Sequence, residues 1–220
     1  MRNIFFLIIL LLSSICSKAQ IVRPFIGFSS YLQWDFEKSS YVGLNSGVEI
    51  KVNRYFLPEL EFSYFLGTLK EESLVNDQYQ KVVSYSRSAS SLNFSFCPKI
   101  AIGNKEDGSN FLSILPRYTF SKIEAKGNYA KLNSDNSITE NHELQNDSQH
   151  SIGLGLGYDI GLSDENTSSL SLILYYNRVN LGKTVNELKN SDEFKIKTSG
   201  VLGAGINYYF GFKRKWNKTK

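Results

Sequence analysis

Apolar and polar residues alternate one by one along most of this chain, and this alternation limits the folds that it can adopt. In the segment 151–162, SIGLGLGYDIGL, one phase holds Ile152, Leu154, Leu156, Tyr158, Ile160 and Leu162, and the other holds Ser151, Gly153, Gly155, Gly157, Asp159 and Gly161. A helix would scatter both sets around its circumference, whereas a strand separates them onto two faces. Helical periodicity is nearly absent from the whole chain, so the sequence predicts an all-β protein.

Eight segments follow this two-residue pattern. Besides 151–162 they are 21–33, 41–52, 56–67, 85–102, 111–123, 168–181 (whose phase blurs after Tyr176) and 201–212. A tilted strand needs about 9–11 residues to cross a bilayer. The connections near 53–55, 103–110 and 163–167 are short, and those near 34–40, 68–84, 124–150 and 182–194 are mostly longer and polar. This asymmetry is typical of an eight-stranded antiparallel up-and-down transmembrane β-barrel with both termini in the periplasm.

The polar phase of these segments carries charges of both signs, which favours a membrane barrel over a soluble one. A soluble β-sandwich or lipocalin-like barrel also alternates, but it turns its polar phase toward water. An eight-stranded membrane barrel has a narrow interior that side chains fill, and its closure removes edges that lipid cannot satisfy. We therefore predict a barrel-interior charge network, with glycines making room for long side chains, formed by Arg23, Glu49, Lys51, Glu59, Glu61, Arg87, Lys99, Arg117 and Asp159.

Aromatic residues gather near the predicted strand ends. Around the first outer loop they are Trp34, Phe36 and Tyr41, and on the periplasmic side they are Tyr55, Phe56, Phe210 and Phe212. This placement predicts two lipid-facing girdles at the membrane interfaces.

The N-terminus, MRNIFFLIILLLSSICSKAQ, has the features of a secretory signal peptide: a positive Arg2, an apolar run over 4–12, and the small residues Ser17 and Ala19 at positions −3 and −1 of the expected cleavage site. We expect residues 1–19 to be the signal peptide, 20–212 the outer-membrane β-barrel and 213–220 a basic periplasmic tail. Lipoprotein processing at Cys16 is the alternative, although Ile15 is bulky for a lipobox. Cleavage after Ala19 leaves Cys97 as the single cysteine, so no intramolecular disulfide can form.

The positive net charge belongs to the two ends of the chain. Removing Arg2 and Lys18 lowers the formal charge from +4 to +2, and the tail KRKWNKTK carries five of the remaining positive charges, which leaves −3 on the body. The sequence therefore predicts no nucleic-acid surface. The tail is either a disordered overhang or a contact to anionic headgroups or a periplasmic partner, with Trp216 as an interfacial anchor.

The whole mature chain resembles the small outer-membrane β-barrel proteins of Gram-negative bacteria, the OmpX/OmpA-type barrels, and the porin-family or PorT-like β-barrel domains common in Bacteroidota. The residues that carry the resemblance are SKAQ at 17–20, GLGLGYDIGL at 153–162 and GVLGAGINYYFGF at 200–212. The resemblance implies an architecture and a location in the bacterial outer membrane, and it brings no active site. Many such barrels end on an aromatic strand residue, whereas here a basic octapeptide follows Phe212.

No catalytic or nucleotide-binding residues are predicted. A dinucleotide fingerprint would need glycine where Tyr158 or Ile160 stands, no helix follows, and there is no Walker lysine. Outer-membrane lipid A deacylases use a His-x-Ser pair, whereas His150 directly precedes Ser151. Adjacent strand residues point to opposite faces, so these two could not readily pair. The other histidine, His142, lies in the third predicted outer loop.

No metal or other cofactor is predicted either. Cys97 has no second cysteine or neighbouring histidine with which to bind zinc. The segment 127–147 could hold Ca²⁺ or Mg²⁺ between lipopolysaccharide phosphates, since against Lys131 it contains Asp135, Glu140, His142, Glu143 and Asp147. These residues lack the spacing of a calcium loop, so a hydrated loop is the favoured interpretation.

The sequence thus indicates a non-enzymatic outer-membrane protein, with outer loops exposed at the cell surface, in a structural or interaction role or as an accessory subunit of an envelope complex. The expected partners are outer-membrane lipid, lipopolysaccharide and envelope proteins. The first alternative is a narrow pore lined by Glu59, Glu61, Arg87 and Arg117, and the second is a lipid-A-modifying enzyme.

Overall fold

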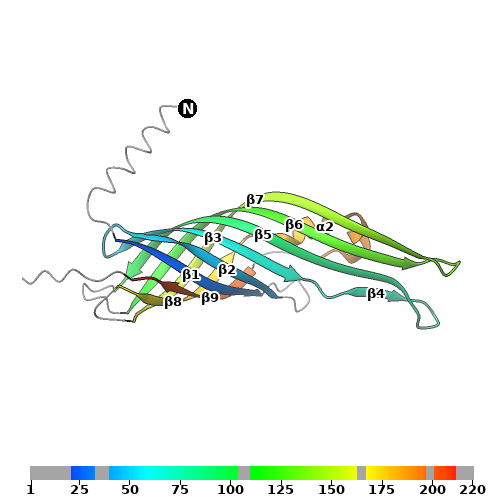
Figure 1. The fold of residues 1–220 in the computed structure, drawn as a ribbon, viewed down its shortest axis with the longest axis horizontal. Coiled ribbons are helices and arrows are strands. Elements are labelled where there is room, and N and C mark those ends of the chain that lie inside the picture. The colour runs from blue at the N-terminus through cyan, green and yellow to red at the C-terminus, as the bar shows by residue number, and fades with distance from the viewer. Residues whose placement is uncertain (1–20, 33–39, 104–109, 163–166, 197–200, 212–220) are drawn as a thin grey trace, which may run out of the picture.

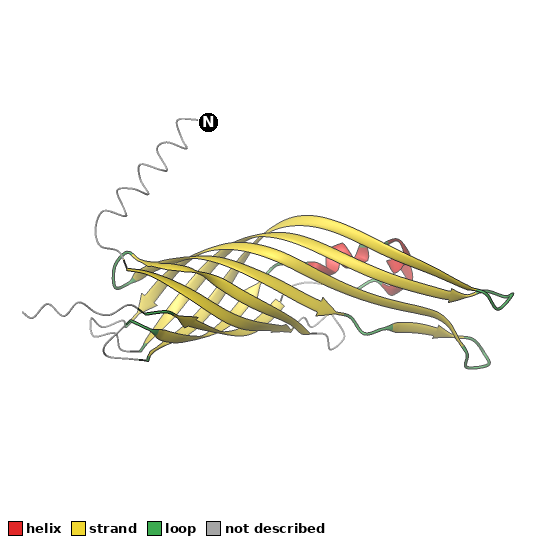
Figure 2. Ribbon diagram, in the orientation of Figure 1, coloured by secondary structure: helices red, strands yellow, loops and turns green. Residues whose placement is uncertain are grey.

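The protein is almost entirely antiparallel β-structure (Figure 1, Figure 2). The structure, a computed structural model, describes residues 21–32, 40–103, 110–162, 167–196 and 201–211. Its strands are β1 (Ile21–Leu32), β2 (Ser40–Lys51), β3 (Phe56–Thr68), β4 (Glu72–Val75), β5 (Lys81–Ile102), β6 (Phe111–Leu132), β7 (Ile138–Gly161), β8 (Ser169–Asn177) and β9 (Val201–Tyr209). Two short helical elements, α2 (Leu181–Asn186) and η1 (Lys189–Phe194), lie between β8 and β9. Among the described residues, no helix is long and apolar enough to span a membrane.

Eight of these strands close into a ring. Each strand is antiparallel to its neighbours, in the order β3-β2-β1-β9-β8-β7-β6-β5, and β3 pairs with β5 to complete the circuit. The first and last strands of the ring meet from Phe25↔Tyr209 to Leu32↔Leu202. The short β4 lies outside the ring and pairs with the first residues of β5. The predicted eight-stranded antiparallel barrel is therefore confirmed, with one additional strand.

The alternation sorts residues by face as predicted. In β7, Ile152 and Leu156 are 69% and 57% exposed, whereas Gly153, Gly155 and Gly157 face the interior. The same arrangement holds around the ring, and it is the reverse of a soluble barrel: large apolar side chains are exposed on the outside, and charged residues are buried inside. The glycines at 153–161 lie in a continuous strand and not in a strand-to-helix turn.

The outward apolar residues form a belt, here called the apolar band. On neighbouring strands its last members are Leu92, Phe120 and Ile152, and Lys122 lies beyond Phe120, next to Leu92 in the register. On β5 the band covers 92–102. At about 3.3 Å per residue and a tilt of about 40°, this segment rises about 25 Å, the height of the apolar belt of transmembrane barrels.

Three strands continue far past the apolar band, which the sequence did not predict. The segment 124–150, predicted as a loop, is the upper part of β6, a turn at 133–137 and the upper part of β7. Likewise, 68–84 contains β4 and the start of β5, and 182–194 contains α2 and η1. We call β4 with 81–91, 121–132 and 138–151 the protruding sheet; it is the right-hand end of the barrel in Figure 1. The end of the barrel that carries the protruding sheet is called the upper end, and the opposite end the lower end. The helical elements lie against it in Figure 2.

One predicted girdle residue is wrong. Tyr41 is only 2% exposed and points into the barrel, in phase with Asn45 and Glu49. The odd-numbered residues of β2 face the interior, and this alternation decides where the Tyr41 side chain points. Its partner across the ladder, Gly67, provides the space, since a Cβ at Gly67 would overlap the Tyr41 ring. At the other end of the barrel, the aromatics Tyr55, Phe56 and Phe210 are exposed as predicted. Trp34, Phe36, Phe212, the signal peptide and the basic tail lie outside the described residues.

Candidate functional site

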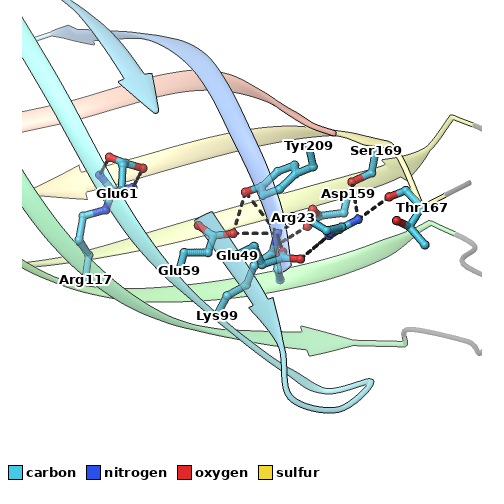
Figure 3. Close-up of polar contacts among 11 residues, drawn as sticks. Arg23, Glu49, Glu59, Glu61, Lys99, Arg117, Asp159, Thr167, Ser169 and Tyr209 are labelled. Carbon is cyan, nitrogen blue, oxygen red and sulfur yellow. Dashed lines mark hydrogen bonds and ion pairs between the residues drawn. The ribbon is translucent and has the colours of Figure 1, made fainter. Parts of the chain in front are cut away.

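The lower lumen holds a buried cluster of charged groups centred on Lys99 (Figure 3). The Lys99 Nζ lies 2.8 Å from Asp159 Oδ1, 3.2 Å from Glu49 Oε2 and 3.2 Å from Glu59 Oε1. All four side chains are fully buried. They come from β2, β3, β5 and β7, so only the closed barrel brings them together.

Arg23 and Tyr209 complete this group, which we call the Lys99 cluster (Arg23, Glu49, Glu59, Lys99, Asp159 and Tyr209). Arg23 Nε donates to Glu49 Oε1 at 2.8 Å, and its Nη1 donates to the Thr167 carbonyl at 2.7 Å. The Tyr209 hydroxyl donates to Glu59 Oε1 at 2.7 Å. The cluster ties six strands of the ring to one another, because Arg23 and Tyr209 add β1 and β9 to the four strands that meet at Lys99.

A second ion pair, between Arg117 and Glu61, crosses the middle of the lumen. Arg117 Nη1 and Nη2 donate to the two carboxylate oxygens of Glu61 at 2.8 and 2.9 Å, a bidentate geometry. The guanidinium also lies 4.6 Å from the centre of the Tyr175 ring. Both charged groups are at most 4% exposed, so this pair and the Lys99 cluster both occupy the interior of the barrel.

The two remaining predicted network residues lie elsewhere. Arg87 is buried near the upper mouth, where Nη2 donates to Glu72 Oε1 of β4 at 2.8 Å and Nη1 donates to the Phe194 carbonyl at 2.6 Å. Lys51 follows the same face of β2 as Glu49 but is partly exposed at its end. The nine predicted residues therefore divide into a five-charge cluster, one central pair, one residue at the mouth and one at the rim.

Sequence reasoning did not single out Tyr209, Ser113 or Glu72. Ser113 Oγ donates to Asp159 Oδ2 at 2.8 Å. Tyr209 and Ser113 follow the interior phase of their strands, so parity alone could have placed them in the lumen. The partnership of Glu72 with Arg87 depends on the pairing of β4 with β5 and has no local signal in the sequence.

The upper end of the lumen is closed by the segment 178–196, which we call the lid. Leu181, Val185 and Leu188 recur at helical spacing and are buried against the interior aromatics of the upper barrel, Tyr31, Tyr41, Phe65 and Tyr175. Asn180 caps α2 by accepting from the Lys183 amide at 3.0 Å. Between the lid and these aromatics, the described residues Leu181, Val179 and Val201 help to line a cavity of about 10 Å³, room for about one water molecule.

Polar contacts fasten the lid to the inner face of the upper β7. The Gln149 side chain donates to the Asn180 carbonyl at 2.9 Å and accepts from the Asn180 amide at 3.1 Å. Asn190 contacts Glu143, and Lys183 Nζ lies 3.2 Å from Asp147 Oδ2. The hydrogen bond from Gln149, assisted by Lys183, lowers the pKa of Asp147 below its usual value.

Replacing Val185 with aspartate should release the lid. Val185 is fully buried, so an aspartate there would place an uncompensated charge among apolar side chains. We expect limited proteolysis within 181–196 to become at least tenfold faster while the barrel stays folded on an unheated gel. Lys183→Ala is the matched control, since it removes the ion pairs of a half-exposed lysine with Asp147 and Glu187 but leaves the buried apolar contacts of the same helix in place, and it should change the cleavage rate much less. Equal rates for both variants would show that burial of Val185 does not hold the lid.

The histidines and acidic residues of the protruding sheet have structural partners. His150 points outward, with Nδ1 2.7 Å from the Tyr118 hydroxyl, whereas Ser151 points inward and is buried. Glu143 and Asp147 hold the lid, and Asp135 accepts from the Ser137 amide in the 133–137 turn at 3.0 Å. Within the described ranges no three His, Cys, Asp or Glu side chains are grouped as metal ligands.

Comparisons with known proteins gave structural neighbours but no sequence relatives. No family model and no curated protein matches the chain. Among solved structures, a major outer membrane protein from Thermus thermophilus is similar at 12% identity and a TM-score of 0.44, over 86% of this chain and all of that one. Ail of Yersinia pestis is similar at 11% identity and a TM-score of 0.40, over 87% of this chain and 98% of that one. Neisserial surface protein A is similar at 10% identity and a TM-score of 0.39, over 87% of this chain and 97% of that one.

At such low scores the fold assignment rests on the strand pairing and burial of this chain itself. The ring of described strands is closed, so within it no ladder edge faces lipid at the level of the apolar band. The exterior is apolar over about the thickness of a bilayer, and the charges are inside. The protein is an eight-stranded membrane-spanning β-barrel of the bacterial outer-membrane type.

Proposed function

We propose that this protein is a non-conducting, non-enzymatic outer-membrane barrel that displays the protruding sheet at the cell surface as an interaction platform. The observation that carries the proposal is the combination of a filled lumen with strands that run far beyond the apolar band. β5, β6 and β7 have 22, 22 and 24 residues, whereas about 9–11 suffice to cross a bilayer. The additional length serves no purpose in spanning the membrane.

The lumen argues against the alternative of a narrow pore. Of the charged residues that would line the path, Arg117 and Glu61 are paired across the interior, Glu59 lies against Lys99, and Arg87 is paired with Glu72 near the mouth. Arg117 and Glu61 bridge the centre, and the Lys99 cluster occupies the lower end. Above them, interior aromatics and the lid leave a cavity of about 10 Å³. A solute would have to break at least one buried ion pair, which costs several kcal/mol.

Single-channel recording in planar bilayers tests this proposal. The purified barrel should give no discrete conductance steps, and neither should Lys183→Ala. Arg117→Ala together with Glu61→Ala, which removes the central bridge, is the variant most able to open the lumen and is the positive comparison. Regular steps from the wild-type barrel would support a pore and contradict a sealed platform.

Display at the surface is tested in cells. A protease recognition sequence inserted in the 133–137 turn, at the tip of the protruding sheet, should be cleaved by protease added to intact cells. The same sequence placed in the short connection around Asn53 and Arg54, at the opposite end of the barrel, should be cleaved only after the outer membrane is opened. The reverse pattern would place the protruding sheet in the periplasm.

Catalysis has little support from the geometry. A His–Ser pair needs hydrogen-bond reach, but His150 and Ser151 point to opposite faces of β7. His142 contacts Asn128 on the outer face of the protruding sheet. Alanine at His150 should therefore leave lipid A acylation unchanged, as judged by mass spectrometry of lipid A from expressing cells.

A further inference from the structure

The charges of the Lys99 cluster do not balance. It holds three carboxylates, Glu49, Glu59 and Asp159, against two cations, Lys99 and Arg23. The three carboxylates and Lys99 are completely buried, and Arg23 is 7% exposed. An uncompensated charge in such an environment costs many kcal/mol, and proteins avoid it by binding a proton. One more positive charge is therefore needed at this site.

The hydrogen bonds identify the carboxyl group that lacks a donor. Asp159 accepts from Lys99 on one oxygen and from Ser113 on the other. Glu49 accepts from Arg23 on one oxygen and from Lys99 on the other. Glu59 accepts from Tyr209 and lies against Lys99 only through Oε1, whereas its buried Oε2 has no hydrogen-bond partner among the described residues.

We propose that the folded barrel binds one proton in its membrane-embedded lumen at neutral pH, on Oε2 of Glu59. A neutral Glu59 leaves Glu49 and Asp159 to balance Lys99 and Arg23. It also keeps Oε1 as an acceptor for the Tyr209 hydroxyl at 2.7 Å. The ion is a proton and not a metal cation, because the Lys99 ammonium already occupies the centre of the carboxylates and Glu59 offers a single free oxygen.

The groups that face Glu59 come from most of the ring. They are Glu49 on β2, Cys97 and Lys99 on β5, Asp159 on β7 and Tyr209 on β9, and Arg23 on β1 lies behind Glu49. β6 and β8 contribute the neutral hydroxyls of Ser113 and Ser169, which contact Asp159 and Arg23. Lys51 lies at the partly exposed rim beyond Glu49, where water can screen its charge.

Infrared spectroscopy of the full chain folded in vesicles of ether-linked lipids, which have no ester carbonyl group, tests the proposal. At pH 7 the wild-type barrel should show the carbonyl stretching band of a protonated carboxylic acid, and this band should disappear on unfolding in urea, because glutamate in unfolded chains is ionised at this pH. Glu59→Gln should abolish the band. Glu61→Gln, which changes a paired carboxylate outside the cluster, should keep it. A wild-type barrel without the band, or a band that persists in Glu59→Gln, would overturn the proposal.

Two further measurements do not depend on the folding of Glu59→Gln. Asp159→Asn leaves two carboxylates for two cations, so it should also abolish the band although Glu59 is intact; a retained band contradicts the charge balance. Second, the folded wild type holds one more proton than the unfolded chain above about pH 5, so its stability should fall as pH rises. The unfolding equilibrium constant should increase up to tenfold per pH unit, and an unchanged constant between pH 5 and 7 would contradict proton binding.

Discussion

Replacing Lys99 with methionine should prevent the barrel from folding or should lower its free energy of unfolding by about 3–5 kcal/mol. The substitution keeps an unbranched side chain that is one atom shorter and removes the cation from between Glu49, Glu59 and Asp159. Deleting one partner of a buried ion pair leaves the other charge without compensation, and the cost follows from that remaining charge. Urea titration in lipid vesicles, followed by the migration of unheated samples on gels, measures the loss.

Lys126→Met is the matched control for this substitution. Lys126 also lies close to a carboxylate, with its Nζ 3.0 Å from Glu124 Oε1, but both side chains are exposed on the protruding sheet. Water and salt screen this pair, so its removal should leave the urea midpoint unchanged. A Lys99→Met barrel as stable as Lys126→Met would show that the Lys99 cluster does not stabilise the fold.

Replacing Leu156 with arginine should destabilise the barrel by about 2–4 kcal/mol. Leu156 lies in the middle of the apolar band on β7, and its neighbours across the ladders are Ile114 and Leu174. An arginine at the bilayer midplane must place its guanidinium in hydrocarbon or distort the bilayer to reach water. The urea midpoint in vesicles should fall accordingly.

Leu144→Arg provides the comparison on the same strand and the same face. The two leucines are almost equally exposed, at 57% and 58%, but Leu144 lies above the apolar band in the protruding sheet. Arginine at 144 should change stability little, because the site is in water. If both substitutions had the same effect, the apolar band would not mark the position of the lipid.

The barrel itself could be predicted because it imposes one physical rule on every strand. Wherever one face of a strand meets lipid and the other meets the lumen, apolar and polar residues must alternate. Whether a position is odd or even in the strand then decides whether its side chain faces lipid or the lumen. Parity also placed Arg23, Glu49, Glu59, Lys99 and Asp159 in the interior. It overrules residue type at Tyr41, where an aromatic residue near a strand end was wrongly assigned to the girdle.

The rule fails where the membrane ends. Above the apolar band both faces of β6 and β7 meet polar surroundings, so 124–150 lost its hydrophobic contrast and resembled a loop although it is paired from Glu124↔Asn146 to Leu132↔Ile138. The lid had a local signal, the helical spacing of Leu181, Val185 and Leu188, but the segment is too short for periodicity to stand out. The meeting of Glu59 with Lys99 and Tyr209 depends on the register of a closed ring, which no single strand specifies.

Accessibility of spin labels in lipid vesicles tests the central claim most directly. Single cysteines at Leu156, Leu144 and Leu115, in a chain with Cys16 and Cys97 replaced by serine, carry the label to the apolar band, to the protruding sheet and to the buried interior, respectively. A membrane-spanning barrel predicts that the label at 156 collides with oxygen dissolved in lipid, that the label at 144 collides with a water-soluble nickel complex, and that the label at 115 is reached by neither. A label at 156 that collides with the aqueous nickel complex as readily as the label at 144 would contradict the account.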